Sequence, residues 1–367
     1  MKVLYYIYGL NFGGAESFIY NLMGSLPDNE CGLYFCLQSS KNENTKLLSL
    51  INQHKNRIFY ITPYNKNPYN NKVDFLKVLE ENKFDIVHFH MNSLLNYSPI
   101  EACMKKKIKV VVHSHNSKSN GGIIGKIIHN INKQKLKNAE IGRFACGEEA
   151  GKWFFDEKKY YIINNGIETN IYRFNQCLRN INRKKYDISD DCMLVGHIGR
   201  FTKQKNHNYI IEIFSEIKKK KRNSKLLLIG DGKLKGFIEE KINSMGLSDD
   251  IILAGNVDNV NELLNAMDVM VFPSFFEGLP FALIEAQASG LPIVASDVVT
   301  KGTKITDLLS FLSLSDNCKI WAEKIIQLAL SDYKNRAQYA DLVSNSPFDS
   351  KKTANQIMSY YQSVLHL

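Results

Sequence analysis

Short apolar runs alternate with amphipathic stretches along almost the whole of this 367-residue chain. The runs have the length of strands and are apolar on both faces, as at residues 3–8 and 193–198. Strands that are apolar on both faces and alternate with helices form parallel sheets with helices on each side. The pattern therefore predicts a doubly wound α/β architecture throughout the chain.

The expected strands form two groups. They fall at residues 3–8, 32–37, 57–61, 86–89, 109–112 and 141–146, and then at 193–198, 225–229, 251–254, 269–272 and 292–295. A chain of this length exceeds the usual size of one hydrophobic core, and the polar, basic stretch 168–191 is the best linker candidate. We therefore expect an N-terminal domain of residues 1–170 and a C-terminal domain of residues 171–349, each Rossmann-like.

The net charge of +10 raises the question of which partner the basic residues contact. Lysines and arginines cluster at residues 105–109, 118–137, 179–185 and 218–222. None of these clusters carries interleaved aromatics, and no zinc-finger or RNP-like pattern is present in the sequence. We therefore expect no nucleic-acid partner.

The segment 123–137 is the most suggestive of the basic stretches. Isoleucines recur in it at helical spacing beside lysines, namely Ile123, Ile124, Ile127, Ile128 and Ile131 with Lys126, Lys133, Lys135 and Lys137. This pattern is typical of a helix that lies on an anionic membrane surface. It fits an ordinary amphipathic helix with solvated lysines equally well, so peripheral contact with the inner face of the plasma membrane is one of two interpretations.

Cysteine usage and hydropathy indicate a cytoplasmic protein. The seven cysteines are odd in number and form no CxxC pair, which suits reduced thiols and argues against a disulfide scaffold or a zinc ribbon. No apolar run is long enough to cross a bilayer, and residues 1–14 are interpreted as a buried strand rather than a leader.

Two acids stand in an otherwise apolar segment, FFEGLPFALIEAQASGLPIV at residues 275–294. Gly278 and Pro280 favour a loop that opens a helix near Pro280, with Glu277 in the loop and Glu285 on the second turn. The unpaired N–H groups of the helix start would add an anion site to two carboxylates that bind hydroxyls. This combination suits a sugar phosphate, although an isolated pair of acids also fits an exposed loop and the polar face of a helix.

The loops expected at the carboxyl ends of the strands carry glycines and basic residues, and ligands of doubly wound sheets bind there. Gly13 and Gly14 follow the first strand and let the backbone approach an anion closely. In GHIGRFTKQKNH, Gly199, Arg200 and Lys205 follow the first strand of the second half. A planar guanidinium and a mobile ammonium suit a diphosphate, whereas two basic loop residues alone are usually solvated charges.

Four histidines form two pairs, His88 with His90 and His113 with His115. Positions i and i+2 of a strand share a face, so two such pairs on neighbouring strands could make a metal site. Against this, no carboxylate-rich partner set follows, and the sequence has no DxD pair to hold a divalent cation against a diphosphate. We therefore expect no metal, and we place the histidines where strands emerge into a cleft.

The motifs together resemble those of the GT-B fold glycosyltransferases of family 4, a large group of retaining sugar transferases. The matching stretches are FGGAE near the N-terminus, NNGIE at residues 164–168, GRFTKQKN, LLLIGDG and FEGLPFALIEAQASGLPIVASD. Their order and spacing agree over nearly the whole chain, and Glu277 and Glu285 match the E-x7-E signature. Within the family the chain looks most like bacterial enzymes of capsular and exopolysaccharide assembly, including the HSHN stretch.

The resemblance implies a nucleotide-sugar site in the C-terminal domain. Arg200 and Lys205 would neutralise the diphosphate, Glu285 would bond the ribose hydroxyls, and Glu277 with neighbouring N–H groups would position the sugar. The implied donor-binding residues are Gly13, Gly14, Gly199, Arg200, Lys205, Glu277, Gly278, Leu279, Pro280 and Glu285. The implied catalytic residues are His115, Glu277, Arg200 and Lys205.

The resemblance also implies that the N-terminal domain binds the acceptor. The family's cleft histidine maps to His115, with His113 as the near rival, and His90 and Asn116 are further candidates for the acceptor side of the cleft. Residues 350–367 look like the final helix that crosses back to this domain. The chain departs from the family pattern after VASD, where it has VVTKGTKITDLL in place of a glycine pair and a further glutamate.

The function implied is retaining transfer of a hexose or N-acetylhexosamine to a lipid-linked or glycan acceptor in bacterial surface polysaccharide synthesis. A uridine diphosphate sugar is preferred over a guanosine one as the donor, and no cofactor or metal is implied. Two alternatives stay open: a non-hydrolysing sugar-nucleotide epimerase on the same fold, and a non-enzymatic protein that binds nucleotides or carbohydrates.

Overall fold

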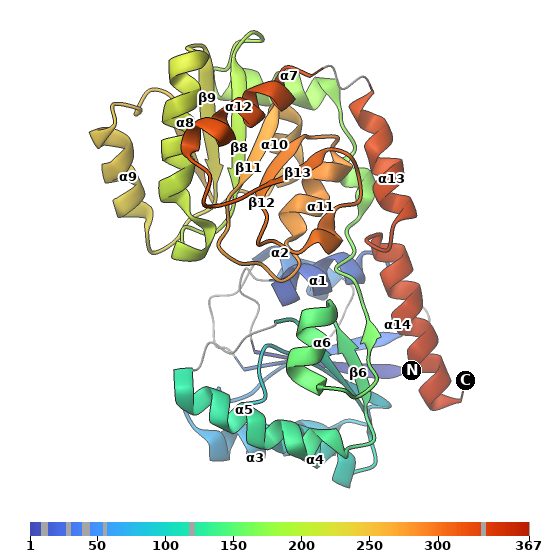
Figure 1. Ribbon diagram of the computed structural model, residues 1–367. Helices are drawn as coiled ribbons and strands as arrows, with labels where there is room; N and C mark the ends of the chain where they lie inside the picture. Colours follow the sequence, from blue (N-terminus) through green and yellow to red (C-terminus); the bar gives the residue numbers. More distant parts are fainter. Residues whose placement is uncertain are drawn as a thin grey trace. The chain divides into compact units, whose positions relative to one another are not determined.

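The computed structural model describes residues 1–8, 14–26, 31–38, 45–53, 57–116, 122–331 and 335–366. The chain divides into two units (Figure 1). Unit 1 comprises Met1–Gly166 with Ser350–Leu367, and unit 2 comprises Ile167–Asp349. The division thus falls at residues 166 and 167, close to the expected boundary at 170 and 171.

The sheet of unit 1 is parallel, with the strand order β3-β2-β1-β4-β5-β6-β7. Its described strands are β1 (Lys2–Ile7), β2 (Gly32–Leu37), β3 (Arg57–Tyr60), β4 (Ile86–Met91), β5 (Lys109–Ser114), β6 (Gly142–Ala145) and β7 (Tyr161–Ile162). The order reverses between β1 and β4, as in a doubly wound fold.

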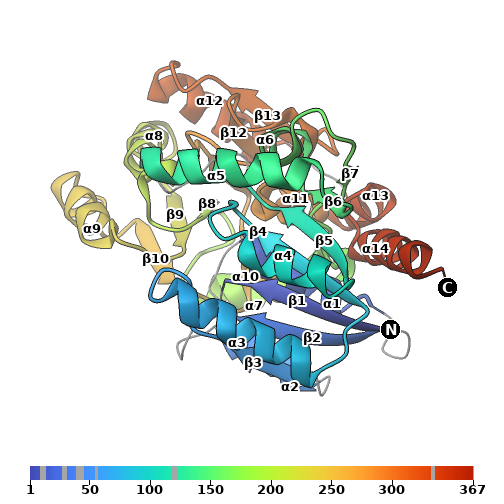
Figure 2. The same ribbon diagram turned by 90° about the horizontal axis from the view of Figure 1, so that it is seen from below.

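Helices cover both faces of this sheet. They are α1 (Gly14–Met23), α2 (Thr45–Gln53), α3 (Pro68–Glu81), α4 (Ser98–Lys105), α5 (Gly122–Lys137), α6 (Glu148–Phe155) and α14 (Ser350–Leu365). The helices α3, α4 and α5 lie on one face (Figures 1 and 2), where Phe75 and Ile100 pack against Leu4 and Phe89 of the strands. The opposite face of β4 meets α1 and α14, through Phe18 and Tyr361.

The sheet of unit 2 is also parallel, with the order β10-β9-β8-β11-β12-β13. Its described strands are β8 (Met193–Ile198), β9 (Ser224–Ile229), β10 (Ile251–Gly255), β11 (Val269–Phe272), β12 (Ile293–Ser296) and β13 (Leu309–Leu312). Side chains of β11 alternate between two cores, because Val271 packs with Phe214 and Trp321 on one face while Phe272 packs with Leu283 on the other.

The α-helices of unit 2 are α7 (Gln176–Lys185), α8 (His207–Lys220), α9 (Lys235–Ser244), α10 (Val260–Ala266), α11 (Phe281–Ala288), α12 (Cys318–Ala329) and α13 (Tyr339–Asn345). Short 3-10 turns, η1 (Thr169–Tyr172), η2 (Lys203–Lys205), η3 (Lys301–Thr303) and η4 (Arg336–Gln338), complete the described elements. Both units are therefore doubly wound α/β structures, as the sequence predicts.

The expected linker at residues 168–191 is wrong, because this stretch folds into unit 2 as η1 and α7. Arg183 is 1% exposed and donates to the carbonyl oxygens of Ala266 (3.0 Å) and Ser189 (2.6 Å). Arg179 forms a 2.6 Å ion pair with Asp268. A basic composition suggested a solvated segment, but two of its arginines bind α10 and the start of β11.

Two strand ends also differ from the expectation. β4 continues to Met91 and β5 to Ser114, so His90 and His113 lie within strands rather than in the loops beyond them. The strands β7 and β13 were not expected, since β7 has only two residues and β13 contains a serine in the sequence LSFL.

Candidate active site

The loops after β8 and β11 carry the residues for which the sequence predicts a nucleotide-sugar site. β8 has β9 on one side and β11 on the other, so the strand order of unit 2 reverses between β8 and β11. Ligands of doubly wound sheets bind beyond the carboxyl ends of strands at this point. Arg200 and Lys205 follow β8, and Glu277 follows β11.

Lys205 and Glu277 form an ion pair in this region. Lys205 Nζ lies 2.6 Å from Glu277 Oε1, and the two side chains are 16% and 9% exposed. The ammonium also lies 4.6 Å from the centre of the Phe272 ring, a distance at which a cation is attracted to the ring face. Both residues were predicted for the site, but their pairing was not, and it gives each charge a partner in a poorly solvated position.

Hydrogen bonds to backbone carbonyl oxygens hold the two loops together. Gln204 Nε2 donates to the carbonyl oxygen of Phe276 (2.8 Å), and the amide of Phe275 donates to the carbonyl oxygen of Gln204 (2.9 Å). Asn206 Nδ2 donates to the carbonyl oxygen of Pro273 (3.2 Å). Both chain neighbours of Lys205, Gln204 and Asn206, are thus hydrogen-bonded to the loop that carries Glu277. These bonds restrict the positions of the two charges.

Glycines allow the loop after β9 to approach the loop after β8. A Cβ atom added at Gly230 would lie 2.3 Å from the carbonyl oxygen of Gly199, and one at Gly232 would lie 2.6 Å from that of Phe201. Gly230 has a φ of +135°, which residues with side chains rarely adopt. Gly230 and Gly232 of the turn LLLIGDG are therefore required because a larger residue would collide with the backbone of the loop after β8.

His197 and His207 lie under the same loop, and sequence reasoning missed them. Both are buried, and His197 Nδ1 is 2.9 Å from the carbonyl oxygen of Val271. Burial, with a smaller contribution from the nearby Lys205, lowers the pKa of His197 well below its usual value and that of His207 to about 4. The two rings are therefore neutral near pH 7, and the cationic groups of the loop are Arg200 and Lys203, which are exposed, and Lys205.

Glu285 lies on α11, which begins directly after Pro280. Tyr172 donates its hydroxyl proton to Glu285 Oε1 over 2.9 Å. Gly278 and Leu279 lie in the loop before the helix, and nothing lies within 4 Å of the position where a Cβ of Gly278 would be. Glu277 is therefore in the loop and Glu285 in the helix, as the Gly-Leu-Pro sequence predicted, whereas the role of Tyr172 left no signal in the sequence.

The segment that departs from the family pattern is organised around Gln287. The Gln287 amide group donates to the carbonyl oxygen of Thr303 (2.8 Å) and accepts from the amides of Ile305 (3.0 Å) and Thr306 (2.9 Å). Gln287 is fully buried. The turn at residues 301–306 is thus fixed to α11 by side-chain hydrogen bonds.

The candidate residues of unit 1 gather at the ends of β4 and β5. His90 Nδ1 is 2.9 Å from His115 Nε2. His113 is fully buried within β5, while His115 and Asn116 follow the strand and are partly exposed. Although His115 is partly exposed as a residue, its ring packs against Phe18, His90 and His113. Burial of the imidazole lowers the pKa of His115 to about 3, and burial holds the pKa values of His90 and His113 well below their usual range.

The glycine pair of unit 1 is only half described. Gly14 is the first residue of α1, is exposed, and has nothing within 4 Å of the position of an added Cβ. Gly13 lies outside the described residues.

Comparison with known families matches nearly the whole chain. Residues 12–171 match the model described as Glycosyltransferase Family 4, and residues 179–342 match Glycosyl transferases group 1. The chain belongs to the family 4 glycosyltransferases. The matched segments correspond to most of unit 1 and most of unit 2, so both halves of this glycosyltransferase carry the family pattern.

Similar proteins have related names and the same fold. The glycosyltransferase is 28% identical to EpsF of Bacillus subtilis (strain 168), named as a glycosyltransferase, over 98% of this chain and 96% of EpsF. It is 24% identical to the Staphylococcus aureus capsular polysaccharide biosynthesis glycosyltransferase CapH over 99% of each chain. The crystal structure of Anabaena HepE in complex with UDP superposes with a TM-score of 0.81 at 17% identity, covering 99% of this chain and 100% of HepE. The enzyme is therefore a GT-B glycosyltransferase, and CapH, one of its relatives, is named for capsular polysaccharide biosynthesis.

Proposed function

We propose that this enzyme transfers a hexose or N-acetylhexosamine, with retention of configuration, from a UDP-sugar to a lipid-linked or glycan acceptor of a bacterial surface polysaccharide. The observation that carries the proposal is the buried Lys205–Glu277 pair at the switch point of unit 2, with Arg200 exposed on the same loop. An ammonium, a guanidinium and a carboxylate at one such point match the needs of a sugar diphosphate.

The diphosphate is neutralised by Arg200, Lys205 and the first amides of α11. Charge develops on the leaving diphosphate as the sugar departs, and donors fixed in place before the reaction stabilise that charge most effectively. In the free enzyme Lys205 is paired with Glu277, so the donor must share the ammonium with this carboxylate. The sugar is then oriented by Glu277 and by the amides of Gly278 and Leu279.

The reaction proceeds on one face of the sugar. The bond from C1 to the diphosphate oxygen breaks, and the bond from C1 to the acceptor oxygen forms on the same face, through an oxocarbenium-like state. The acceptor hydroxyl proton moves to the departing phosphate oxygen, so no carboxylate acts as a covalent nucleophile as in glycosidases. The diphosphate is held by side chains in place of Mg²⁺, and adding Mg²⁺ is expected to leave the rate unchanged.

Glu285 binds the ribose hydroxyls of the donor. Two carboxylate oxygens can accept from the two vicinal hydroxyls, and Tyr172 fixes the carboxylate by its 2.9 Å hydrogen bond. The UDP complex of HepE, a protein of the same fold, supports a uridine donor.

Unit 1 contributes the acceptor side. We assign His115 to orienting the sugar or accepting a hydrogen bond from it, since it follows β5 and is partly exposed while His113 is buried in the strand. Asn116 and His90 support this position, His90 through its 2.9 Å contact with His115. Gly14, at the start of α1, supports phosphate binding through its backbone amide, and Gly13, the other glycine predicted for this role, lies outside the described residues.

Helix α5 contacts the membrane that carries a lipid-linked acceptor at the inner face of the plasma membrane. Its buried side is unusually polar, because His129 accepts from the amide of Leu94 (3.1 Å) and Asn132 donates to the carbonyl oxygen of Leu94 (2.7 Å). Its isoleucines point outward, with exposed fractions of 79% for Ile123, 73% for Ile124, 54% for Ile127, 37% for Ile128 and 55% for Ile131. An ordinary amphipathic helix would bury this stripe.

Vesicle flotation tests the membrane contact. None of the helices in the described part of the chain has the length and apolarity to span a bilayer. Replacing Ile127 and Ile131 by aspartate should reduce binding to phosphatidylglycerol vesicles by at least about tenfold. The matched control is Ile181→Asp, which changes an isoleucine of α7 that is 62% exposed. Equal loss in both variants, or no vesicle binding by the parent enzyme, would refute the assignment of α5.

The catalytic proposal is tested with radiolabelled nucleotide-sugars and a lipid-diphosphate sugar acceptor. A labelled lipid or glycan product with the anomeric configuration of the donor supports the proposal. Interconversion of sugar nucleotides without acceptor would identify an epimerase, and binding without turnover a non-enzymatic protein. Glu285→Ala and Lys205→Ala should abolish transfer while the circular dichroism spectrum stays native, and full activity in either folded variant would overturn the site.

A further inference from the structure

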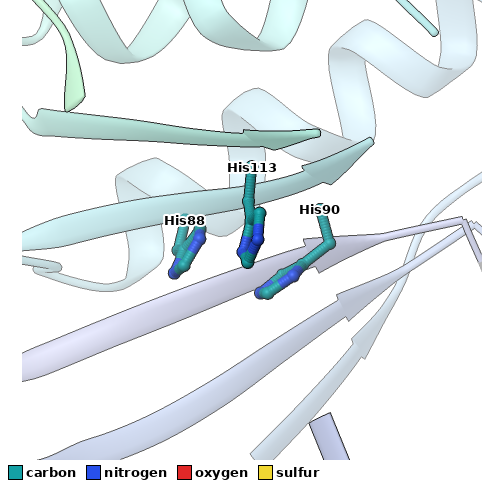
Figure 3. A group of neighbouring side chains, drawn as sticks. All are labelled: His88, His90 and His113. Carbon is teal, nitrogen blue, oxygen red and sulfur yellow. The ribbon is translucent and has the colours of Figure 1, made fainter. Parts of the chain in front are cut away.

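Histidines crowd one face of the unit 1 sheet. His88 and His90 lie on β4 and His113 on the neighbouring strand β5, with the three rings side by side (Figure 3). His115 follows on the same side, with its ring centre 4.1 Å from that of His113. The three strand histidines are almost fully buried, so they do not act as ordinary surface imidazoles.

The backbone fixes this arrangement. His90 and His113 are directly paired in the parallel register, and His88 precedes His90 by two residues on the same face. The ring centres of His88 and His90 are 4.2 Å apart, and each is 5.5 Å from the ring centre of His113. Neighbouring strands in a hydrogen-bonded sheet cannot slide, so the strand register keeps the backbone positions of the three histidines close together.

The cluster contains several ring nitrogens that lack partners. Among the described residues, no hydrogen-bond partner is found for His88 Nε2, His90 Nε2 or either nitrogen of His113. Buried polar atoms are ordinarily hydrogen-bonded, and leaving one unpaired costs free energy. Several such atoms at one place indicate that a partner is expected there.

Tyr361 of α14 engages one nitrogen of His88. The Tyr361 hydroxyl contacts His88 Nδ1 and the Tyr5 hydroxyl, the latter over 3.3 Å, so Nε2 is the His88 nitrogen left for the cluster. With the proton on Nδ1, the lone pair of Nε2 is available to a metal ion. A histidine whose other nitrogen donates to an oxygen is the usual arrangement of a metal ligand.

The chemistry of the cluster selects a class of ligand. The cluster offers three buried imidazoles, and the neutral imidazole is the form that coordinates a metal ion. The group holds no carboxylate within reach in the described residues, which disfavours Mg²⁺ and Ca²⁺. Imidazole suits Zn²⁺, Ni²⁺ and copper.

The distances fit after a small movement. The candidate ligand atoms of the three residues all lie within 4.8 Å of one another. An ion at the centre of an equilateral triangle with sides of 4.8 Å would lie about 2.8 Å from each nitrogen, and Zn–N bonds are about 2.0–2.1 Å. Each coordinating nitrogen must therefore move toward the ion by about 0.7 Å or less. The imidazole planes must also turn from their stacked arrangement so that the three lone pairs point at the ion.

We propose that His88, His90 and His113 form a binding site for one late first-row transition-metal ion, such as Zn²⁺, inside unit 1. The ion is structural, because it joins β4 and β5 and, through Tyr361, stabilises the contact with α14. A hydroxide or chloride in a fourth position would lower the charge of the buried ion, as in three-histidine zinc sites with an open position. The site is separate from the donor residues of unit 2, so its failure and that of the proposed reaction are distinguishable.

Metal analysis of the enzyme purified without a histidine tag tests this site. After treatment with a chelator, the enzyme should take up one equivalent of Zn²⁺, and Co²⁺ should give the visible absorption bands of nitrogen coordination. Tyr361→Phe removes a hydrogen-bond partner of a ligand and should lower the affinity for Zn²⁺ by roughly 10–100-fold. His113→Ala removes a ligand itself and should lower this affinity further. His366→Asn, which changes an exposed histidine with a φ of +57°, should have no effect.

Anomalous scattering from a crystal grown with Zn²⁺ locates the ion and keeps the proposal testable if the His113 variant does not fold. A peak among the three imidazoles supports the site. Ordered waters alone at that position, uptake below one equivalent, or Co²⁺ without nitrogen coordination in the parent enzyme would overturn it. Uptake that is unchanged in a folded His113→Ala variant would place the ion elsewhere and would also overturn it.

Discussion

Replacing Lys205 by methionine should separate the stabilising role of its ion pair from its role in catalysis. Methionine keeps the length of the side chain but leaves the Glu277 carboxylate, only 9% exposed, without its 2.6 Å partner. Breaking a buried pair from one side costs about 3–5 kcal/mol. Because Lys205 is still 16% exposed and water can partly replace it, we expect the lower end, about 3 kcal/mol.

The size of this loss is measurable by thermal unfolding. Each kcal/mol shifts the Tm of a domain of this size by about 2–4 °C, so the transition of unit 2 should fall by about 6–12 °C. Adding Glu277→Gln to Lys205→Met removes the unpaired charge and should recover most of the Tm. Activity should not recover, because the diphosphate has still lost a cation, and we expect kcat to be about 10²–10³-fold below that of the parent in both variants.

A matched control comes from the same unit. Lys220 and Glu323 form an ion pair whose side chains are 46% and 59% exposed, and an exposed pair contributes at most about 1 kcal/mol. Lys220→Met should therefore change Tm and kcat little. If Lys205→Met is as stable as Lys220→Met, or if the double variant is no more stable than Lys205→Met, the reasoning about the buried pair is wrong.

Three further predictions concern unit 2. Tyr172→Phe removes the hydroxyl that holds Glu285 and should raise the KM for the nucleotide-sugar by roughly fivefold, the equivalent of one hydrogen bond; an unchanged KM would dissociate Tyr172 from donor binding. Gly230→Ala places a Cβ 2.3 Å from the carbonyl oxygen of Gly199 at a φ of +135° and should lower the free energy of unfolding by more than about 1 kcal/mol. The control Gly236→Ala, in α9 with nothing within 4 Å of the added Cβ, should raise it by about 0.5–1 kcal/mol. Chemical denaturation of the two variants measures both changes. Burial lowers the pKa of His207 to about 4, so the unfolded chain binds a proton at this residue before the folded chain does as the pH falls below about 6.5. The free energy of unfolding should therefore fall by about 1 kcal/mol at pH 5.5. His207→Gln should reduce this loss between pH 7.5 and 5.5, and an equal loss in the variant would show that other groups cause it.

Most strands of the two sheets were predictable from their apolar runs, but β7, with two residues, and β13, which contains a serine, were not. The runs at residues 193–198 and 269–272 became β8 and β11 with these same bounds. The loops that carry Arg200, Lys205 and Glu277 follow from strand order, since the carboxyl ends of parallel strands lie at one edge.

The remaining features depend on contacts between distant residues. A basic run does not reveal that Arg183 will be buried against the carbonyl oxygen of Ala266, 83 residues away. Nor does the E-x7-E spacing show that Glu277 pairs with Lys205 or that Tyr172 holds Glu285. Histidine spacing indicated that each pair shares a face, but the alignment of His90 with His113 required the strand register.

Helix α14 makes unit 1 a discontinuous structure, with a consequence for how the chain acquires its fold during synthesis. The β4 histidine His88 finds its hydroxyl partner only in Tyr361, 273 residues further along the chain, and Gly142 of β6 packs directly under Tyr360. A ribosome that has made residues 1–166 has therefore made a sheet with part of one face uncovered. Unit 2, continuous from Ile167 to Asp349, can finish folding first, so the half of the protein that is translated first is completed last.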